Sequence, residues 1–146
     1  MSEGLRVRRL SGGDIDAFLP ELARLRIQVF REYPYLYDGS VAYEEKYLKA
    51  YANVPESVMV LVWDGARVVG ASSGLPMEVE TPEAMAPFIA HGYDPKRIFY
   101  YGESVLLPEY RGRGLGNRFF EERETHARGL ARFDIACFCA IERPAD

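Results

Sequence analysis

The sequence predicts one α/β domain with a mixed sheet (α+β type), formed by residues 1–146. The length and the hydrophobic and charged fractions, 48% and 27%, are those of a globular domain with its own core. Short apolar runs alternate with amphipathic segments along the chain, which is typical of strands and helices that cover each other. The Asp64-Gly65 pair between two apolar runs predicts a hairpin, so part of the sheet is antiparallel.

The first half of the chain is predicted to hold three strands and two helices. Leu and Val alternate with Arg from Leu5 to Leu10, as in a half-buried strand. Apolar residues at helical spacing continue to Arg31, with Pro20 near the first turn, and Ser40 is placed to cap the next helix. The expected elements are a strand at residues 5–10, a helix at 11–31, a helix at 40–52 and paired strands at 58–63 and 67–73.

The second half is predicted to alternate helices and strands. The expected elements are a short helix at 81–90, a strand at 99–107, a helix at 114–128 and a strand at 133–141. Gly129 suits the position that follows a helix C-terminus. The last strand is apolar on both faces, which favours a place inside the sheet. Cys137 and Cys139 share one face of it, and we expect small buried apolar residues there rather than a disulfide.

Composition and charge exclude several classes of protein. A net charge of −4 argues against a nucleic-acid partner, because such proteins usually carry a basic patch. No apolar run approaches the ~18 residues of a membrane span, and the N-terminus lacks the apolar stretch of a signal peptide. We therefore expect a cytoplasmic protein with no membrane contact. His91 and His126 are the only histidines and form no cluster with the cysteines, so no metal site is expected.

The most informative segment is residues 105–117, where an apolar strand runs into a glycine-rich loop and then into a helix. Gly112, Gly114 and Gly116 let backbone N–H groups approach a ligand closely. The helix adds unpaired N–H donors and the positive end of its dipole. Together these features predict a site for a phosphate or pyrophosphate, with Arg111 and Arg113 adding charge at its rim.

Two common phosphate loops do not fit this segment. A P-loop needs Gly-Lys-Ser or Gly-Lys-Thr, which does not occur, and the glycine spacing differs from a dinucleotide-binding fingerprint. Residues 111–116, Arg-Gly-Arg-Gly-Leu-Gly, fit the pattern [RQ]-x-x-G-x-[GA]. With Leu-Leu-Pro-Glu-Tyr at 106–110, the segment resembles the coenzyme A loop of the GCN5-related N-acetyltransferase (GNAT) family. The resemblance implies acetyl-coenzyme A as co-substrate, held by Val105, Leu106, Leu107, Arg111, Gly112, Arg113, Gly114, Leu115, Gly116 and Asn117.

The predicted order of elements is similar to the GNAT acyl-coenzyme A N-acyltransferase fold through its fifth strand. Members of the family usually continue with one more helix and two strands, which these 146 residues lack. A strand left as a bare apolar edge is a pairing and aggregation hazard. We therefore expect either that a second copy covers the last strand in a homodimer or that the native protein is longer and this domain is truncated at its C-terminus.

Acetyl transfer to an amine needs a base, an oxyanion donor and a proton for the leaving thiolate. In the family that this segment resembles, the acyl carbonyl lies against a backbone N–H of the fourth strand, which corresponds here to a position near Leu106. Glu103 is the only carboxylate in that strand, and burial among apolar neighbours could raise its pKa. Tyr100 occupies the position that holds glutamate in histone-type members. We expect Glu103 and Tyr100 to be catalytic; the alternatives are a structural Glu103 and a proton relay through Tyr100 or Tyr101.

Six of the ten tyrosines lie between residues 33 and 51. In the family that the sequence resembles, this segment forms the acceptor pocket. An aromatic wall with carboxylates nearby suits a cationic amine. The residues expected to bind the acceptor are Tyr33, Tyr35, Tyr37 and Asp38, with Glu44 nearby. Tyr43, Tyr47 and Tyr51 share a helix face, and ordinary packing onto the sheet explains that stripe.

The predicted function is direct transfer of an acetyl group to a primary amine of a small molecule or a protein. One alternative is a non-catalytic sensor that binds acetyl-coenzyme A and transfers nothing. Another is a serine hydrolase, because Gly70-Ala71-Ser72-Ser73-Gly74 matches the G-x-S-x-G motif. That motif requires a turn from strand to helix, whereas the sequence here predicts the end of a hairpin strand, so we interpret the match as coincidence.

Overall fold

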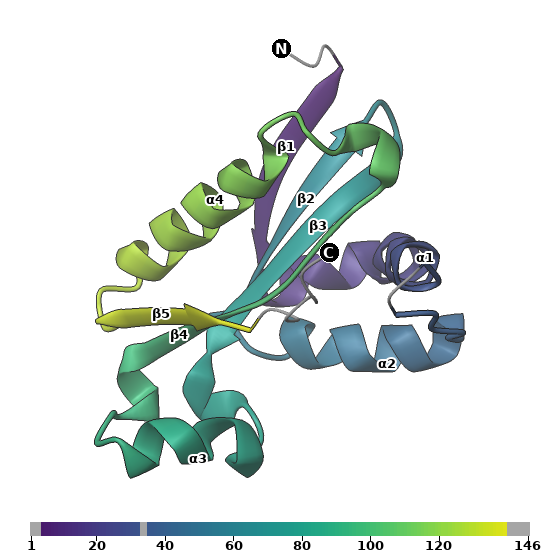
Figure 1. The fold of residues 1–146 in the computed structure, drawn as a ribbon. Helices are drawn as coiled ribbons and strands as arrows, with labels where there is room; N and C mark the ends of the chain where they lie inside the picture. Colours follow the sequence, from purple (N-terminus) through teal and green to yellow (C-terminus); the bar gives the residue numbers. More distant parts are fainter. Residues whose placement is uncertain (1–3, 33–34, 140–146) are drawn as a thin grey trace, which may run out of the picture.

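The computed structural model describes residues 4–32 and 35–139. Within these residues the chain forms five strands and four α-helices (Figure 1). The strands are β1 (Leu5–Ser11), β2 (Val58–Asp64), β3 (Arg67–Pro76), β4 (Ile98–Leu106) and β5 (Ile135–Phe138). The helices are α1 (Leu19–Phe30), α2 (Val41–Ala52), α3 (Pro82–Ala90) and α4 (Leu115–Gly129). The sheet runs in chain order, antiparallel from β1 to β4 and parallel between β4 and β5, which confirms the mixed α/β prediction.

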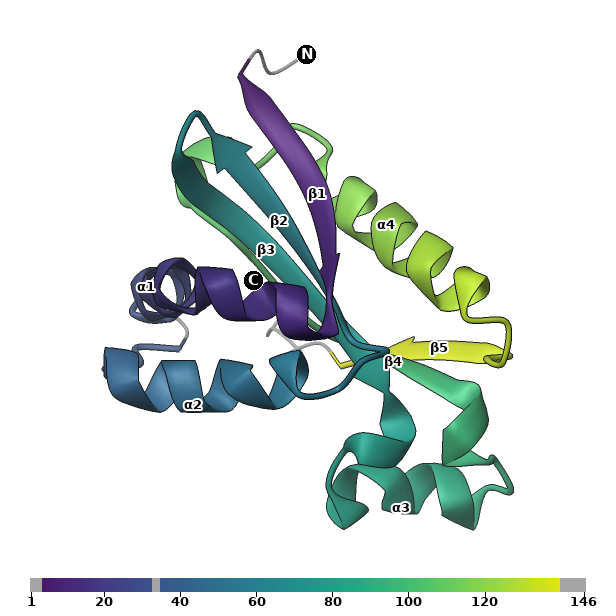
Figure 2. The same ribbon diagram turned by 180° about the vertical axis from the view of Figure 1, so that it is seen from behind.

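Helices cover both faces of the sheet. α1 and α2 lie against one face and α4 lies against the other, whereas α3 lies beyond the end of the sheet (Figures 1 and 2). β2 and β3 are buried along nearly their whole length because helices cover them on both sides. Among the described helices, none has the length and apolar character needed to cross a membrane.

Local signals in the sequence set several of the element boundaries. The Ser40 hydroxyl accepts a hydrogen bond from the Tyr43 N–H at 3.2 Å, which confirms the predicted cap of α2. Gly65 has a φ of 61° in the turn between β2 and β3, as the Asp-Gly pair predicts. The first predicted helix is split, however: residues 12–18 form a 3-10 helix, and α1 begins at Leu19 with Pro20 in its first turn.

Several predictions about the C-terminal part are wrong. Gly129 belongs to α4, and the left-handed residue beyond the helix is Ala131, with a φ of 59°. Of residues 133–139, only Ile135–Phe138 form β5, and they pair with four residues of β4; residues 140 and 141 of the predicted strand lie outside the described residues. It lies at the edge of the described sheet and alternates half-buried with exposed side chains, so Phe138 is 57% exposed. Cys137 is half-buried and Cys139 is exposed, and neither is a core residue.

A bulge interrupts β4 near its middle. Ser73 of β3 faces two residues of β4, Gly102 and Glu103, so β4 has one residue more than its partner there. The pairing of β4 with β5 ends just before this point, at Tyr101. Because a bulge bends a strand and increases its twist, it helps the two strands to separate. Beyond Tyr101, the edge of β4 that faces away from β3 has no strand partner among the described residues.

Candidate active site

The open edge of β4 presents backbone groups beside the glycine loop. The Leu107 N–H donates to the Val69 carbonyl at 3.0 Å, so the alternation of an antiparallel ladder turns the Leu106 N–H and C=O away from β3. The Leu106 carbonyl accepts a hydrogen bond from Arg111 Nε at 3.0 Å. The Leu106 N–H points to the edge where β5 has separated, and it can donate a hydrogen bond to an acyl carbonyl there.

The glycine loop leads from β4 into α4 and exposes a row of N–H groups. Gly112 and Gly114 have φ angles of 78° and 80°, in the region that favours glycine. Within the described residues no acceptor binds the backbone N–H groups of Gly112, Gly114, Leu115, Gly116 or Asn117. A Cβ built on any of these three glycines meets no atom within 4 Å, so the loop surface is open to a ligand. With the dipole of α4, these donors fit a pyrophosphate.

The other predicted coenzyme residues lie around this row of donors. Val105 and Leu107 are buried, so only their backbone can face a ligand that lies on the glycine loop. The Arg111 side chain is 53% exposed, and its guanidinium lies 3.9 Å from the Glu32 carboxylate. Arg113 is exposed, donates to the Glu109 carbonyl at 3.0 Å and lies over the Tyr110 ring. Both arginines therefore lie close enough to the loop to add positive charge at its rim.

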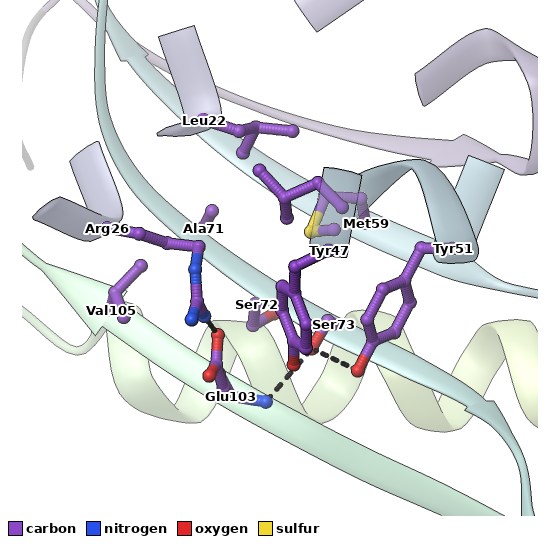
Figure 3. Close-up of a pocket in the computed structure, with 11 residues that line it drawn as sticks. Leu22, Arg26, Tyr47, Tyr51, Met59, Ala71, Ser72, Ser73, Glu103 and Val105 are labelled. Carbon is purple, nitrogen blue, oxygen red and sulfur yellow. Dashed lines mark hydrogen bonds and ion pairs between the residues drawn. The ribbon is translucent and has the colours of Figure 1, made fainter. Parts of the chain in front are cut away.

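The Glu103 carboxylate lies on the opposite side of β4 from α4, and Arg26 of α1 pairs with it (Figure 3). The Glu103 N–H donates to the Ser73 hydroxyl at 2.9 Å, and the same hydroxyl contacts the Tyr51 hydroxyl at 3.5 Å. A Cβ on Gly102 would lie 2.5 Å from Ser73 Oγ and 2.8 Å from the Tyr51 hydroxyl oxygen, so only glycine fits there. The bulge thus fixes the backbone of Glu103.

Arg26 connects Glu103 to a fully buried carboxylate on α2. Its Nε pairs with Glu44, whose other oxygen accepts a 2.7 Å hydrogen bond from the Tyr37 hydroxyl. This bond is the main reason that the pKa of Tyr37 rises to about 12. The guanidinium also lies over the rings of Phe30 and Tyr47, at 5.0 and 4.5 Å from their centroids. The Arg26 guanidinium therefore pairs with two carboxylates and contacts two aromatic rings.

Three adjoining cavities in the described part of the chain share Glu103 and Tyr47. The first lies between α1, α2 and the sheet and is lined by Arg26, Ser72 and Ser73, among others (Figure 3). The second, of about 210 Å³, is lined by Tyr51, Glu80 and Tyr100. The third, of about 390 Å³, is lined by Phe30, Tyr35, Tyr37 and Glu44. We call these three cavities together the acceptor cleft.

Tyr100 and Tyr101 lie on opposite faces of β4, which separates two alternatives that the sequence leaves open. Tyr100 lines the acceptor cleft, and burial is the main cause that raises its pKa to about 12. Tyr101 packs on the α4 side, where the Arg123 guanidinium lies 4.8 Å from its ring centroid. Tyr100 is therefore the tyrosine of the pair that can give a proton inside the cleft.

A second arginine, Arg123 of α4, supports the bulge from the other face. It is 1% exposed and donates to the carbonyls of Ser73 and Glu103, at 3.1 and 3.4 Å, and to the Ser104 hydroxyl at 3.0 Å. Burial lowers its pKa to about 10, and its ring contacts are with Tyr101 and Phe120. Arg123 thus links the helix that follows the glycine loop to the backbone of the candidate base.

We expect Arg123→Met to lower the free energy of unfolding by about 1–3 kcal/mol, because it leaves buried carbonyl oxygens without a donor. Urea denaturation measures this change. Arg128→Met on the same helix is the matched control, since Arg128 is exposed and pairs with Glu124. We expect that variant to stay within about 0.5 kcal/mol of the parent. Equal effects of the two substitutions would contradict the role given to Arg123.

Comparison with known proteins gives a consistent result for the fold. No protein-family model and no curated protein matches the chain. Among solved structures, the aminoglycoside N-acetyltransferase AAC(6')-Iy in complex with CoA matches with a TM-score of 0.68, at 10% identity over 97% of this chain and 80% of that one. An aminoglycoside acetyltransferase from an uncultured soil metagenomic sample matches with a TM-score of 0.65, at 16% identity over 97% and 80%. A GNAT family acetyltransferase of Staphylococcus aureus matches with a TM-score of 0.63, at 16% identity over 96% and 89%.

The chain has the GNAT acetyltransferase fold. The structure places the predicted site residues as follows. Tyr100 lies in the part of β4 that still pairs with β5, Glu103 lies just beyond it, and the glycine loop follows the end of β4. Tyr35 and Tyr37 line the acceptor cleft, whereas Asp38 is exposed and lines none of its cavities. Tyr33 lies outside the described residues.

The position of Ser72 decides the meaning of the G-x-S-x-G motif. Ser72 lies in the middle of β3 rather than in a turn from strand to helix, so the hydrolase motif is a coincidence. Arg26, Glu80 and Arg123 were not expected from the sequence, although Arg26 and Arg123 each lie one turn from buried apolar residues on their helices. Among the described residues, no group of three metal-binding side chains comes together.

Proposed function

We propose that this chain is an acetyl-coenzyme A-dependent N-acetyltransferase that acts on a primary amine by direct attack. One observation carries the proposal: the row of unpaired N–H groups at the glycine loop and the cleft that holds Glu103 are joined by the open edge of β4. A long thioester bound along that edge brings its acyl group to the cleft. Solved structures of the same fold in complex with CoA and with a CoA bisubstrate analog support acetyl-coenzyme A as co-substrate.

Acetyl-coenzyme A supplies the acetyl group as a thioester, and residues of this chain supply the rest of the chemistry. Glu103 accepts the proton that the ammonium group must lose before its nitrogen can attack. The Leu106 N–H donates to the oxygen that becomes negative as the C–N bond forms. As the C–S bond breaks, the Tyr100 hydroxyl protonates the leaving sulfur and is restored by the second proton that nitrogen releases. The acceptor is a small molecule or a protein amine, and the expected location is the cytoplasm.

We expect Tyr100→Phe to lower kcat by about 10²-fold, at the low end of the range for loss of a general acid. Because the pKa of Tyr100 is raised to about 12, its hydroxyl keeps its proton below that pH, and the parent should lose no activity through this group up to about pH 11. The control is Tyr93→Phe, which changes an exposed tyrosine in the segment after α3. A kcat unchanged by Tyr100→Phe would remove this tyrosine from the mechanism.

One observation favours the alternative of a non-catalytic sensor. Arg26 pairs with Glu103, so an internal cation already neutralises the candidate base. A sensor would bind acetyl-coenzyme A in calorimetry and release no coenzyme A thiol with any amine. An enzyme would release thiol only when an acceptor amine is present.

A further inference from the structure

Glu80 is an unpaired carboxylate in the acceptor cleft. It follows the 3-10 turn at residues 77–79 after β3 and is half-buried. Its carboxylate has no hydrogen-bond or ion-pair partner among the described residues, and burial raises its pKa. It lines the cavity of about 210 Å³ that also holds Glu103 and Tyr100. A carboxylate in this position is desolvated without a cation to offset that cost.

The charges that line the cleft are unbalanced. The described residues around its three cavities include three carboxylates, those of Glu44, Glu80 and Glu103, and one guanidinium, that of Arg26. Arg26 pairs with both Glu44 and Glu103 and does not pair with Glu80. The lining therefore keeps a net negative charge that a ligand with more than one positive charge can neutralise.

The walls of the cavity between Glu80 and Glu103 also suit a cation. Tyr47, Tyr51 and Tyr100 line the cavity between Glu80 and Glu103, and aromatic faces attract ammonium groups.

We propose that Glu80 is a second anchor for the acceptor, and that the preferred acceptor carries two cationic groups on a short apolar linker. One amine lies at Glu103 and receives the acetyl group, while Glu80 holds the other cationic group against the tyrosines. This inference rests on the proposed function for the first amine. It adds the class of acceptor, a diamine, and a residue that selects it.

The test compares a linear diamine with the monoamine of the same chain length, for the parent and for Glu80→Gln. We expect the parent to have a KM about 10-fold lower for the diamine, and Glu80→Gln to raise the diamine KM about 10-fold more than the monoamine KM. Glu80→Asp keeps the charge and should keep most of the diamine preference. Glu121→Gln removes an exposed carboxylate on α4 and is the control for net charge.

Calorimetry of each amine without acetyl-coenzyme A separates this inference from the proposed function. If the parent acetylates neither amine, the proposed function is wrong, but tighter diamine binding that Glu80→Gln abolishes still supports the anchor. If the parent acetylates amines and Glu80→Gln changes the KM for both equally or for neither, the anchor is wrong and the proposed function stands. Equal affinity of the parent for the two amines would also overturn it.

Discussion

Glu103→Gln is expected to lower kcat by about 10²–10⁴-fold, the range for loss of a general base. The amide keeps the size of the carboxylate but cannot accept the amine proton. The contacts that fix the backbone of Glu103 do not involve its carboxylate, because Ser73 accepts from its N–H and Arg123 donates to its carbonyl. The bulge should therefore persist, and the affinity for acetyl-coenzyme A should be unchanged.

Steady-state kinetics test this expectation, with Glu121→Gln as the control for loss of one negative charge. Glu121→Gln should keep the kcat of the parent, because Glu121 is exposed on α4. A Glu103→Gln variant with the kcat of the parent would assign Glu103 to structure alone, as the partner of Arg26.

Gly114→Val is expected to weaken acetyl-coenzyme A binding by about 10- to 100-fold, equivalent to the loss of one charge-assisted hydrogen bond. Gly114 precedes α4 with a φ of 80°, and a β-branched residue there is strained by about 1–2 kcal/mol. The added side chain does not collide with the protein, because a Cβ at this position meets nothing within 4 Å. Instead it projects from the loop beside the N–H groups that we expect to hold the pyrophosphate.

The matched control is Gly92→Val. Gly92 has a φ of 84° in the turn after α3, and a Cβ there also meets nothing within 4 Å. The two variants therefore carry the same backbone strain, and only one changes the loop. Calorimetry should show that Gly114→Val binds acetyl-coenzyme A more weakly than the parent, whereas Gly92→Val binds it as tightly as the parent. Equal affinities for the two variants would contradict the assignment of the coenzyme loop.

Much of the fold could be predicted because short-range signals determine it. Ser40 caps α2, the Asp64-Gly65 pair forms the hairpin, and Gly112 and Gly114 lie in the loop before α4. Each of these depends on the backbone preferences of one or two residues, which a single sequence contains. The same holds for the shape of the glycine loop, whose unpaired donors are backbone groups.

The acceptor cleft could be predicted only in part, because its contacts join residues far apart in the chain. Arg26 follows Leu22 and precedes Phe30 at helical spacing, so a charge interrupts a buried stripe, and Arg123 lies likewise between Phe119 and Ala127. That pattern indicates a buried arginine, but the sequence cannot name the partners of either one. The carboxylates that pair with Arg26 come from α2 and β4.

The errors at the C-terminus have a different cause. Residues 133–141 are apolar enough for a strand buried on both faces, and the prediction assumed that composition and position agree. In the structure, β5 pairs only with the four residues of β4 that precede the bulge, and its length follows from that partner. A bulge and the separation of two strands are tertiary features with no signal in β5 itself.

The most direct test of the proposed acetyl transfer is one assay that follows coenzyme A thiol and N-acetylated amine together, with a diamine as acceptor. We expect the parent to release thiol only when the amine is present, in an amount equal to the N-acetylated product. The Glu103→Gln variant should bind acetyl-coenzyme A normally and release almost no thiol. Normal binding of acetyl-coenzyme A by the parent with no amine-dependent thiol release, across an amine panel, would contradict the account and identify the chain as a binding module.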